Sequence, residues 1–163
     1  MGRGPREATM SQPTTPQTCF ICRKHRGEIE SPGGAVYEDE LVYAGHAFIP
    51  DGKDAAYLGM LLLEPKRHAA NWGDLTDAEG AALGRAAVKL SRALVAACGA
   101  EHVYSFVLGH SIDHLHMFLI PRYPDTPREF WGLNVDDWPG APRGGLEEIA
   151  DLCGKVRAAL RAG

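Results

Sequence analysis

The chain has 163 residues, of which 17 are Lys or Arg and 21 are Asp or Glu, so its formal net charge is −4. Hydrophobic residues make up 45% and charged residues 23%, which excludes a wholly disordered chain and is sufficient for one domain with its own core. The acidic balance excludes a general electrostatic affinity for nucleic acid polymers or an anionic membrane surface. Any recognition of phosphate must therefore come from a local binding site and not from the overall charge.

The start of the chain predicts a flexible leader followed by one domain. Residues 1–17 are rich in Gly, Pro, Thr and Gln and show no apolar periodicity, and we assign residues 18–163 to a single domain. No apolar stretch typical of a signal peptide follows the first charges, and no segment approaches the roughly 20 apolar residues of a membrane span. We therefore expect a cytoplasmic protein without membrane contact, whose cysteines stay free or bind metal.

Five strands are predicted along the chain. Residues 35–44 predict two short strands around an acidic turn, and the apolar run 57–63, which ends before Glu64, predicts a buried strand. Residues 103–108 and 112–120 predict two more.

Two helices complete the predicted elements. In the first, over residues 77 to about 98, Thr76 and Glu79 match a capping box and Gly99 matches a C-terminal stop. The second covers residues 146–160. These elements predict an α+β fold, with an antiparallel sheet of about five strands, a packed long helix and a C-terminal helix. The expected inner faces carry Leu83, Ala87, Leu90 and Leu94 in the first helix, and Leu146, Ile149, Cys153, Val156 and Leu160 in the second.

Two histidines near the start of the last predicted strand are the main chemical signal. Because side chains alternate across a strand, His114, His116 and Phe118 share one face. Such a pair is either two partly exposed surface histidines or a reactive site. Imidazole, with a reference pKa of about 6.5, is largely neutral at pH 7, so it can attack phosphorus or bind a metal. The opposite face is expected to join the core through Leu115, Met117 and Leu119.

Cys19 and Cys22 form a second pattern. Two thiolates at this spacing can chelate a tetrahedral zinc, which then needs two more ligands. The spacing alone favours incidental free thiols, and a redox pair is less favoured because no βαβ pattern surrounds it. We expect ordinary packed thiols at the other two cysteines, and solvated loop or strand-edge positions for His25, His46 and His102.

Residues 110–123 resemble the signature strand of the histidine triad (HIT) superfamily, in which three histidines alternate with apolar residues after a Gln and a Ser. Three more segments are similar to landmarks of that family: the Cys-x-x-Cys of residues 19–22, the early strand and turn of residues 36–40, and the Pro-Lys-x-His of residues 65–68. The resemblance covers residues 19 to about 123.

The resemblance implies a HIT-like fold, usually as a homodimer, and a nucleotide-binding hydrolase or nucleotidyl transferase. Such proteins act at the α-phosphate of a nucleotide conjugate, for example a dinucleoside polyphosphate or a phosphoramidate, through a covalent nucleotidyl-histidine. Carried over to this chain, His116 is the nucleophile, His114 supports it, and Ser111 contacts the phosphate or leaving group. Trp131 can stack on a base in the partner subunit's site. In part of the family a zinc ion is bound by the counterparts of Cys19, Cys22, His68 and His114.

The chain departs from the family pattern at several positions. Phe118 stands in place of the third histidine and cannot donate a hydrogen bond, and losing one such donor can cost on the order of 10²–10³ in rate. His110 stands in place of the Gln, and our hypothesis is that it partly replaces the missing donor. The Asn- and Gly-bearing loop and the ribose-binding Asp of the family have no clear counterparts. The alternatives are a catalytically degenerate nucleotide-binding or regulatory HIT protein, or a small metal-binding interaction module.

Overall fold

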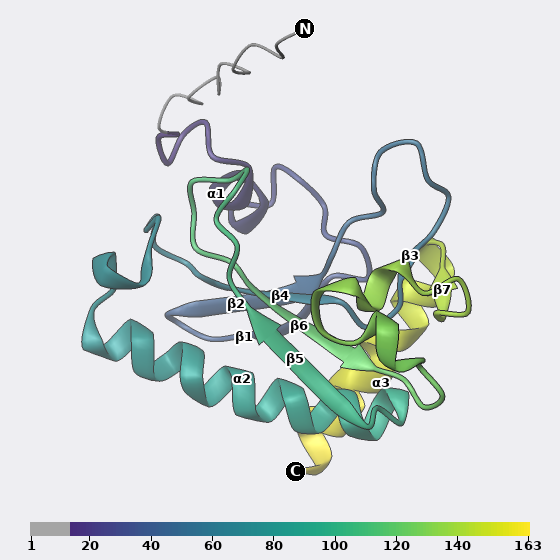
Figure 1. The fold of residues 1–163 in the computed structure, drawn as a ribbon. Coiled ribbons are helices and arrows are strands. Elements are labelled where there is room, and N and C mark those ends of the chain that lie inside the picture. Colours follow the sequence, from purple (N-terminus) through teal and green to yellow (C-terminus); the bar gives the residue numbers. More distant parts are fainter. Residues whose placement is uncertain (1–13) are drawn as a thin grey trace, which may run out of the picture.

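A computed structural model describes residues 14–163, so most of the predicted leader, residues 1–17, lies outside the described part. Five strands form one sheet with the order β1-β2-β4-β6-β5 (Figure 1). Every pairing in this sheet is antiparallel, which confirms the predicted α+β class. The strands are β1 (Ala35–Glu38), β2 (Val42–His46), β4 (Leu61–Pro65), β5 (His102–Phe106) and β6 (Met117–Arg122).

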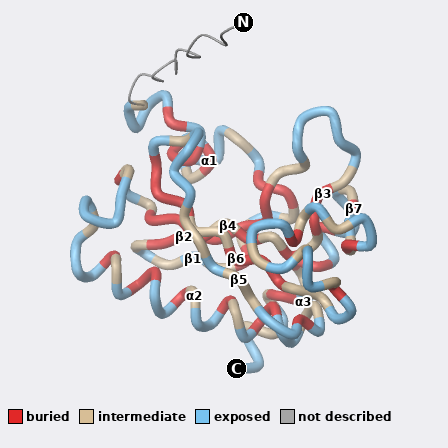
Figure 2. The backbone as a smooth tube through the Cα atoms, in the orientation of Figure 1, coloured by how far each residue is buried: buried red, intermediate tan, exposed pale blue. Residues whose placement is uncertain are grey.

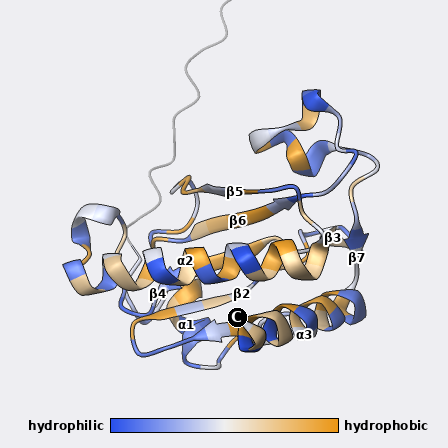
Figure 3. Ribbon diagram, turned by 90° about the horizontal axis from the view of Figure 1, so that it is seen from below, coloured by the Kyte–Doolittle hydropathy of each residue, from blue (hydrophilic) through white to orange (hydrophobic). Residues whose placement is uncertain are grey.

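Two long helices, α2 (Asp77–Cys98) and α3 (Leu146–Ala162), cover one face of this sheet, and in Figure 3 they lie in front of the strands. The short helix α1 (Phe20–His25) lies on the other side of the sheet from α2 (Figure 1). A small second sheet pairs β3 (Ala56–Tyr57) with β7 (Arg143–Gly144), beside the 3₁₀ helices Arg128–Phe130 and Gly132–Asp137. No helix within residues 14–163 is long and apolar enough to cross a membrane.

The long helix α2 begins and ends where its sequence predicts. The Thr76 hydroxyl accepts a hydrogen bond from the Glu79 N–H at 3.2 Å, and the Glu79 carboxylate accepts one from the Thr76 N–H at 2.8 Å. Gly99 ends the helix with a φ of 66°, in the left-handed region that glycine adopts without strain. Buried and exposed stretches alternate along the helix (Figure 2), and Leu83, Leu90 and Leu94 are fully buried in the core.

The structure corrects two of the predicted strands and one of the residues predicted to face the core. The run 57–63 is not one strand, because a turn at Gly59, with a φ of 86°, separates β3 from β4. The last strand of the sheet begins at Met117 rather than at residue 112, because residues 107–116 form the loop that carries both histidines. Leu146 is 63% exposed, since Ile149, one turn later, is the first residue of α3 that is buried in the core.

The start of α2 also anchors the segment that carries His68. The side chain of Arg67 donates to both carboxylate oxygens of Glu79, at 2.8 and 2.7 Å. These hydrogen bonds, followed by that from the Thr76 N–H, lower the pKa of Glu79 from 4.5 to about 2. Because the folded-state pKa lies below the unfolded value, Glu79 contributes stability above about pH 4.5 that is lost as the pH falls toward 2.

We predict that Glu79→Gln lowers the free energy of unfolding by about 1 kcal/mol at pH 7, and that the difference from wild type shrinks at pH 3. Urea denaturation at the two pH values measures the difference in the free energy of unfolding between this variant and the wild type. The exposed Glu40 provides the matched control, because Glu40→Gln removes a carboxylate that makes no hydrogen bond within residues 14–163. A difference for Glu79→Gln that is equal at both pH values would contradict the assignment.

Candidate functional site

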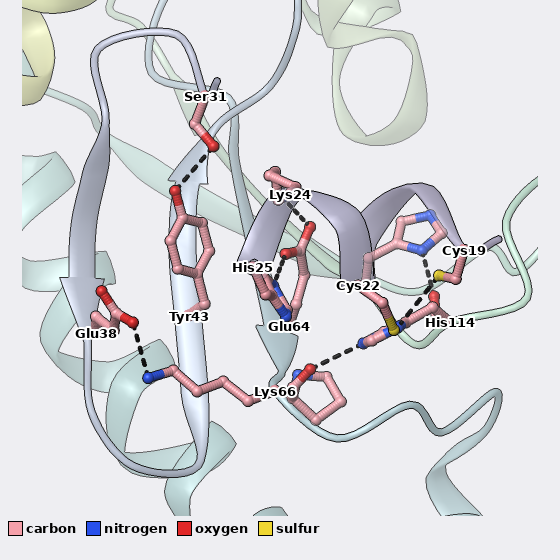
Figure 4. A network of polar contacts seen from close by, with 12 residues as sticks. Cys19, Cys22, Lys24, His25, Ser31, Glu38, Tyr43, Glu64, Lys66 and His114 are labelled. Carbon is pink, nitrogen blue, oxygen red and sulfur yellow. Dashed lines mark hydrogen bonds and ion pairs between the residues drawn. The ribbon is translucent and has the colours of Figure 1, made fainter. Parts of the chain in front are cut away.

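The four residues predicted to bind metal lie together. Cys19 directly precedes α1 and Cys22 lies in its first turn, whereas His68 follows β4 and His114 belongs to the loop before β6. Their ligand atoms all lie within 4.8 Å of one another, and Cys19, Cys22 and His114 are buried. Figure 4 shows Cys19, Cys22 and His114 converging from these separate elements. The fold therefore brings together side chains that are up to 95 positions apart in the chain.

The orientation of His114 suits a metal ligand. Its Nε2–H donates to the Pro65 carbonyl oxygen at 2.8 Å, so its Nδ1 lone pair faces the sulfur atoms of Cys19 and Cys22 at 3.5 and 3.4 Å. Burial lowers the pKa of His114 to about 4, so the ring is neutral at pH 7. A backbone carbonyl on the far nitrogen is the usual way in which a metal-binding histidine is held in place.

The remaining donors complete a set that can hold one ion. The Nδ1 of His68 lies 3.4 Å from the sulfur of Cys22. Burial, followed by the nearby Cys19, raises the pKa of Cys22 to about 11, so a bound cation would have to displace its proton. A cavity of about 490 Å³, lined by Cys22, His68 and Arg26 among others, opens beside the cluster and gives a path to it. Two sulfurs with two imidazole nitrogens match the donors of a tetrahedral zinc site.

A buried ion pair fixes α1 above this cluster. Glu64 is fully buried in β4, and its two carboxylate oxygens accept hydrogen bonds from Lys24 Nζ at 2.7 Å and His25 Nε2 at 2.8 Å (Figure 4). Burial alone would raise the pKa of Glu64, but the hydrogen bond from His25 and the charge of Lys24 lower it. The last turn of α1 is thus held to the sheet by charge.

Sequence reasoning missed this ion pair. The prediction that His25 is solvated is wrong, since its side chain is only 8% exposed. The signal in the sequence is an acidic residue, Glu64, directly after three leucines, because an acid inside a buried strand needs cationic partners.

The prediction that His46 is solvated is also wrong. His46 is 2% exposed, and its Nδ1–H donates to the Ala47 carbonyl oxygen while its Nε2 accepts the Gly59 N–H. Burial lowers the pKa of His46, so it serves as a neutral bridge between β2 and the turn before β4. His102 is exposed on the edge strand β5, as expected.

His116 lies next to the cluster on the face of the chain that its sequence predicts. Its Nδ1–H donates to the carbonyl oxygen of His114 at 2.7 Å, because a carbonyl can only accept. The Nε2 of a neutral His116 therefore carries the lone pair. Its ring meets that of Phe118 edge-on, with the centroids 5.5 Å apart. The alternating residues Leu115, Met117 and Leu119 belong to or pack against the core shared with α2, as predicted.

The other predicted site residues lie at different places. His110 and Ser111 are exposed in the loop before His116, and neither side chain is hydrogen-bonded within residues 14–163. The guanidinium groups of Arg122 and Arg128 lie 3.8 and 5.4 Å from the ring centroid of Trp131, whose Nε1–H donates to the Thr126 carbonyl oxygen. Arg122 ends β6, about 20 Å along an extended strand from His116, so Trp131 is remote from His116 within one chain. The predicted role of Trp131, which is to stack on a base in the partner subunit's site, stays a prediction.

We predict that Glu64→Gln lowers the free energy of unfolding by about 3 kcal/mol, because it leaves the Lys24 ammonium buried without a counter-charge. Glu38→Gln is the matched control, since Glu38 pairs with Lys66 at 2.8 Å but is half exposed, and its loss should cost less than about 1 kcal/mol. Urea denaturation of both variants measures the difference. Equal losses of stability would show that the buried pair contributes no more than the exposed one.

Comparisons with known proteins identify the family to which this chain is related. The HIT domain family matches residues 28–125. Over 129 residues the chain is 30% identical to the Protein hit of Bacillus subtilis, covering 75% of this chain and 84% of that protein. Over 150 residues it is 29% identical to an adenosine 5′-monophosphoramidase of Schizosaccharomyces pombe, covering 88% and 99% of the two chains.

Likeness to solved structures extends over most of the fold. The crystal structure of a Zn-bound histidine triad family protein from Mycobacterium smegmatis matches with a TM-score of 0.67 at 18% identity, covering 91% of this chain and 96% of that one. Because the family match spans more than half of its residues, this chain belongs to the HIT family and has a HIT-like fold.

Proposed function

We propose that this protein binds a nucleotide conjugate and acts as a hydrolase or nucleotidyl transferase at its α-phosphate. Membership of the HIT family and the likeness to a monophosphoramidase support nucleotide hydrolysis at the level of the family. The observation that carries the proposal for this chain is the hydrogen bond from His116 Nδ1 to the His114 carbonyl, which leaves Nε2 as the nucleophilic nitrogen.

In the proposed reaction the Nε2 lone pair of His116 forms a bond to the α-phosphorus while the bond to the leaving group breaks. The leaving group departs with the bonding electrons, and the nucleotidylated ring becomes positively charged. The His114 carbonyl oxygen stabilises that charge through Nδ1–H. Water or another acceptor then bonds to phosphorus and loses its proton to solvent, and the electrons of the N–P bond return to Nε2.

The loop before His116 supplies the other groups of the proposal. Ser111 and His110 are exposed there and can donate hydrogen bonds to the phosphoryl oxygens. We place Phe118 at the third triad position, two residues after the nucleophile. That position also supports the second candidate function, a catalytically degenerate nucleotide-binding or regulatory protein, because a phenyl ring gives no hydrogen bond.

We further propose that Cys19, Cys22, His68 and His114 bind one structural zinc ion. The converging donors and the neutral His114 ring support this assignment. A bound ion would link α1 to the loop before β6 and so hold the carbonyl that orients His116. From the family resemblance we also retain a cytoplasmic homodimer, in which the 40% exposed Trp131 reaches a base in the partner's site.

We predict that the wild-type protein forms a covalent adduct with the labelled nucleotide of a dinucleoside polyphosphate or nucleoside phosphoramidate, and that His116→Ala abolishes it. Intact-protein mass spectrometry after acid-free quenching measures the adduct. His102→Ala is the control, because His102 is an exposed histidine on β5 outside the site. Binding of the nucleotide by the wild type without adduct or turnover would favour the degenerate protein instead.

We predict about one zinc ion per chain in the wild type and its loss in Cys22→Ser, with a fall in the melting temperature that a chelator reproduces. Cys98→Ser is the matched control, since Cys98 lies at the end of α2 outside the cluster. Because zinc displaces the proton of Cys22, its affinity should fall as the pH is lowered. Elemental analysis measures the content, and a metal-free wild type that cannot be loaded with zinc would refute the site.

A further inference from the structure

The side of His116 that faces β5 is lined by hydrocarbon. Phe118 contacts the His116 ring at 5.5 Å between centroids and at the same time stacks on Phe106 of the neighbouring strand, at 5.1 Å and 21°. Phe106 and Phe118 are register partners in the β5–β6 pair, so the backbone holds the stack in place. Both rings are partly exposed, which leaves them free to line a bound substrate.

The polar groups that do contact His116 are already committed. The Nδ1 proton of His116 is held by the His114 carbonyl, and its Nε2 forms the new bond to phosphorus. The Nε2–H of the His114 ring donates to the Pro65 carbonyl, and its Nδ1 lone pair faces the Cys22 thiol. Neither the His114 carbonyl, which accepts the hydrogen bond of His116, nor the Phe118 ring, which packs against its imidazole, has a proton to give to a departing atom.

Chemistry then separates two classes of leaving group. An amine needs a proton on its nitrogen when the P–N bond breaks, because an amide anion is far too basic to leave. A polyphosphate chain or a nitrophenolate leaves as a stable anion with the bonding electrons and needs no acid. A nucleophile that has the Phe118 ring beside it, in place of a proton donor, should therefore discriminate between these two classes.

We propose that the Phe106–Phe118 stack makes this protein selective for nucleotide conjugates whose leaving group departs as a stable anion, such as nucleoside polyphosphates, over phosphoramidates. Phe118 is the specificity-determining residue. The inference rests on the proposed nucleotidyl-transfer function and narrows its substrate class. It also separates this chain from the monophosphoramidase to which it is similar.

The test compares two substrates of each ribonucleoside, the 5′-monophosphate 4-nitrophenyl ester and the 5′-phosphoramidate, in single turnovers of the wild type. We expect leaving-group release from the ester to be at least about 10²-fold faster. In Phe118→His, phosphoramidate turnover should rise by about 10²-fold while ester turnover changes by less than about tenfold. Phe118→Leu, which adds no donor, should keep the wild-type ratio.

The outcomes distinguish the selectivity from the proposed function on which it rests. Equal rates for the two substrates in the wild type, or an unchanged ratio in Phe118→His, would overturn the selectivity. Loss of a fast phosphoramidate reaction in His110→Ala would overturn it too, by identifying His110 as the acid. No adduct at His116 with any ester would instead refute the proposed function itself. If Phe118→His failed to fold, the wild-type and Phe118→Leu rates would still decide the question.

Discussion

His114 is the residue through which the two halves of the site are joined, because each of its polar groups faces a different partner. Its Nε2–H donates to Pro65 at the end of β4, its Nδ1 faces the thiols of α1, and its carbonyl oxygen accepts the Nδ1–H of His116. A shift of its backbone would therefore displace the converging Cys and His side chains and the His116 ring together. The His114 carbonyl thus determines which nitrogen of a neutral His116 carries the lone pair.

The position of α1 is as important as the position of His114. A helix of six residues is too short to be stable alone, so its place must come from contacts. Glu64 supplies two of them as charge-assisted hydrogen bonds to Lys24 and His25, and Ile112 packs against the apolar residues beside Cys19. A buried ion pair of this kind costs desolvation energy, but it gives a defined place to the helix that carries Cys22 and begins directly after Cys19.

His116, which directly precedes β6, lies between a polar and an apolar environment. The Nδ1–H of His116 donates to the carbonyl of His114, whose own ring faces the Cys22 thiol, and the His116 ring also meets Phe118, which stacks on Phe106. The first environment orients the imidazole. The second supplies no hydrogen-bond donor, and in the proposed reaction this makes the chemistry of the leaving group the variable that distinguishes substrates.

Local signals in the sequence determined much of this protein. The capping pair Thr76 and Glu79 defined the long helix to its first residue, since both hydrogen bonds are made within one turn. Alternation around His116 predicted which neighbours join the core, because the period of an extended chain does not depend on its partners. The Cys-x-x-Cys pair and the family resemblance identified the four donors that the fold brings together.

Only the tertiary structure decided how charged and polar groups are paired. Glu64, His25 and His46 looked like boundary or surface residues in the sequence, yet all three are buried and hydrogen-bonded to partners between 1 and 40 positions away. The stack of Phe118 on Phe106 likewise needs the register of β5 against β6. The physical reason is the same in each case. Whether a side chain can be buried depends on the groups that face it, and the fold of the whole chain determines which groups those are.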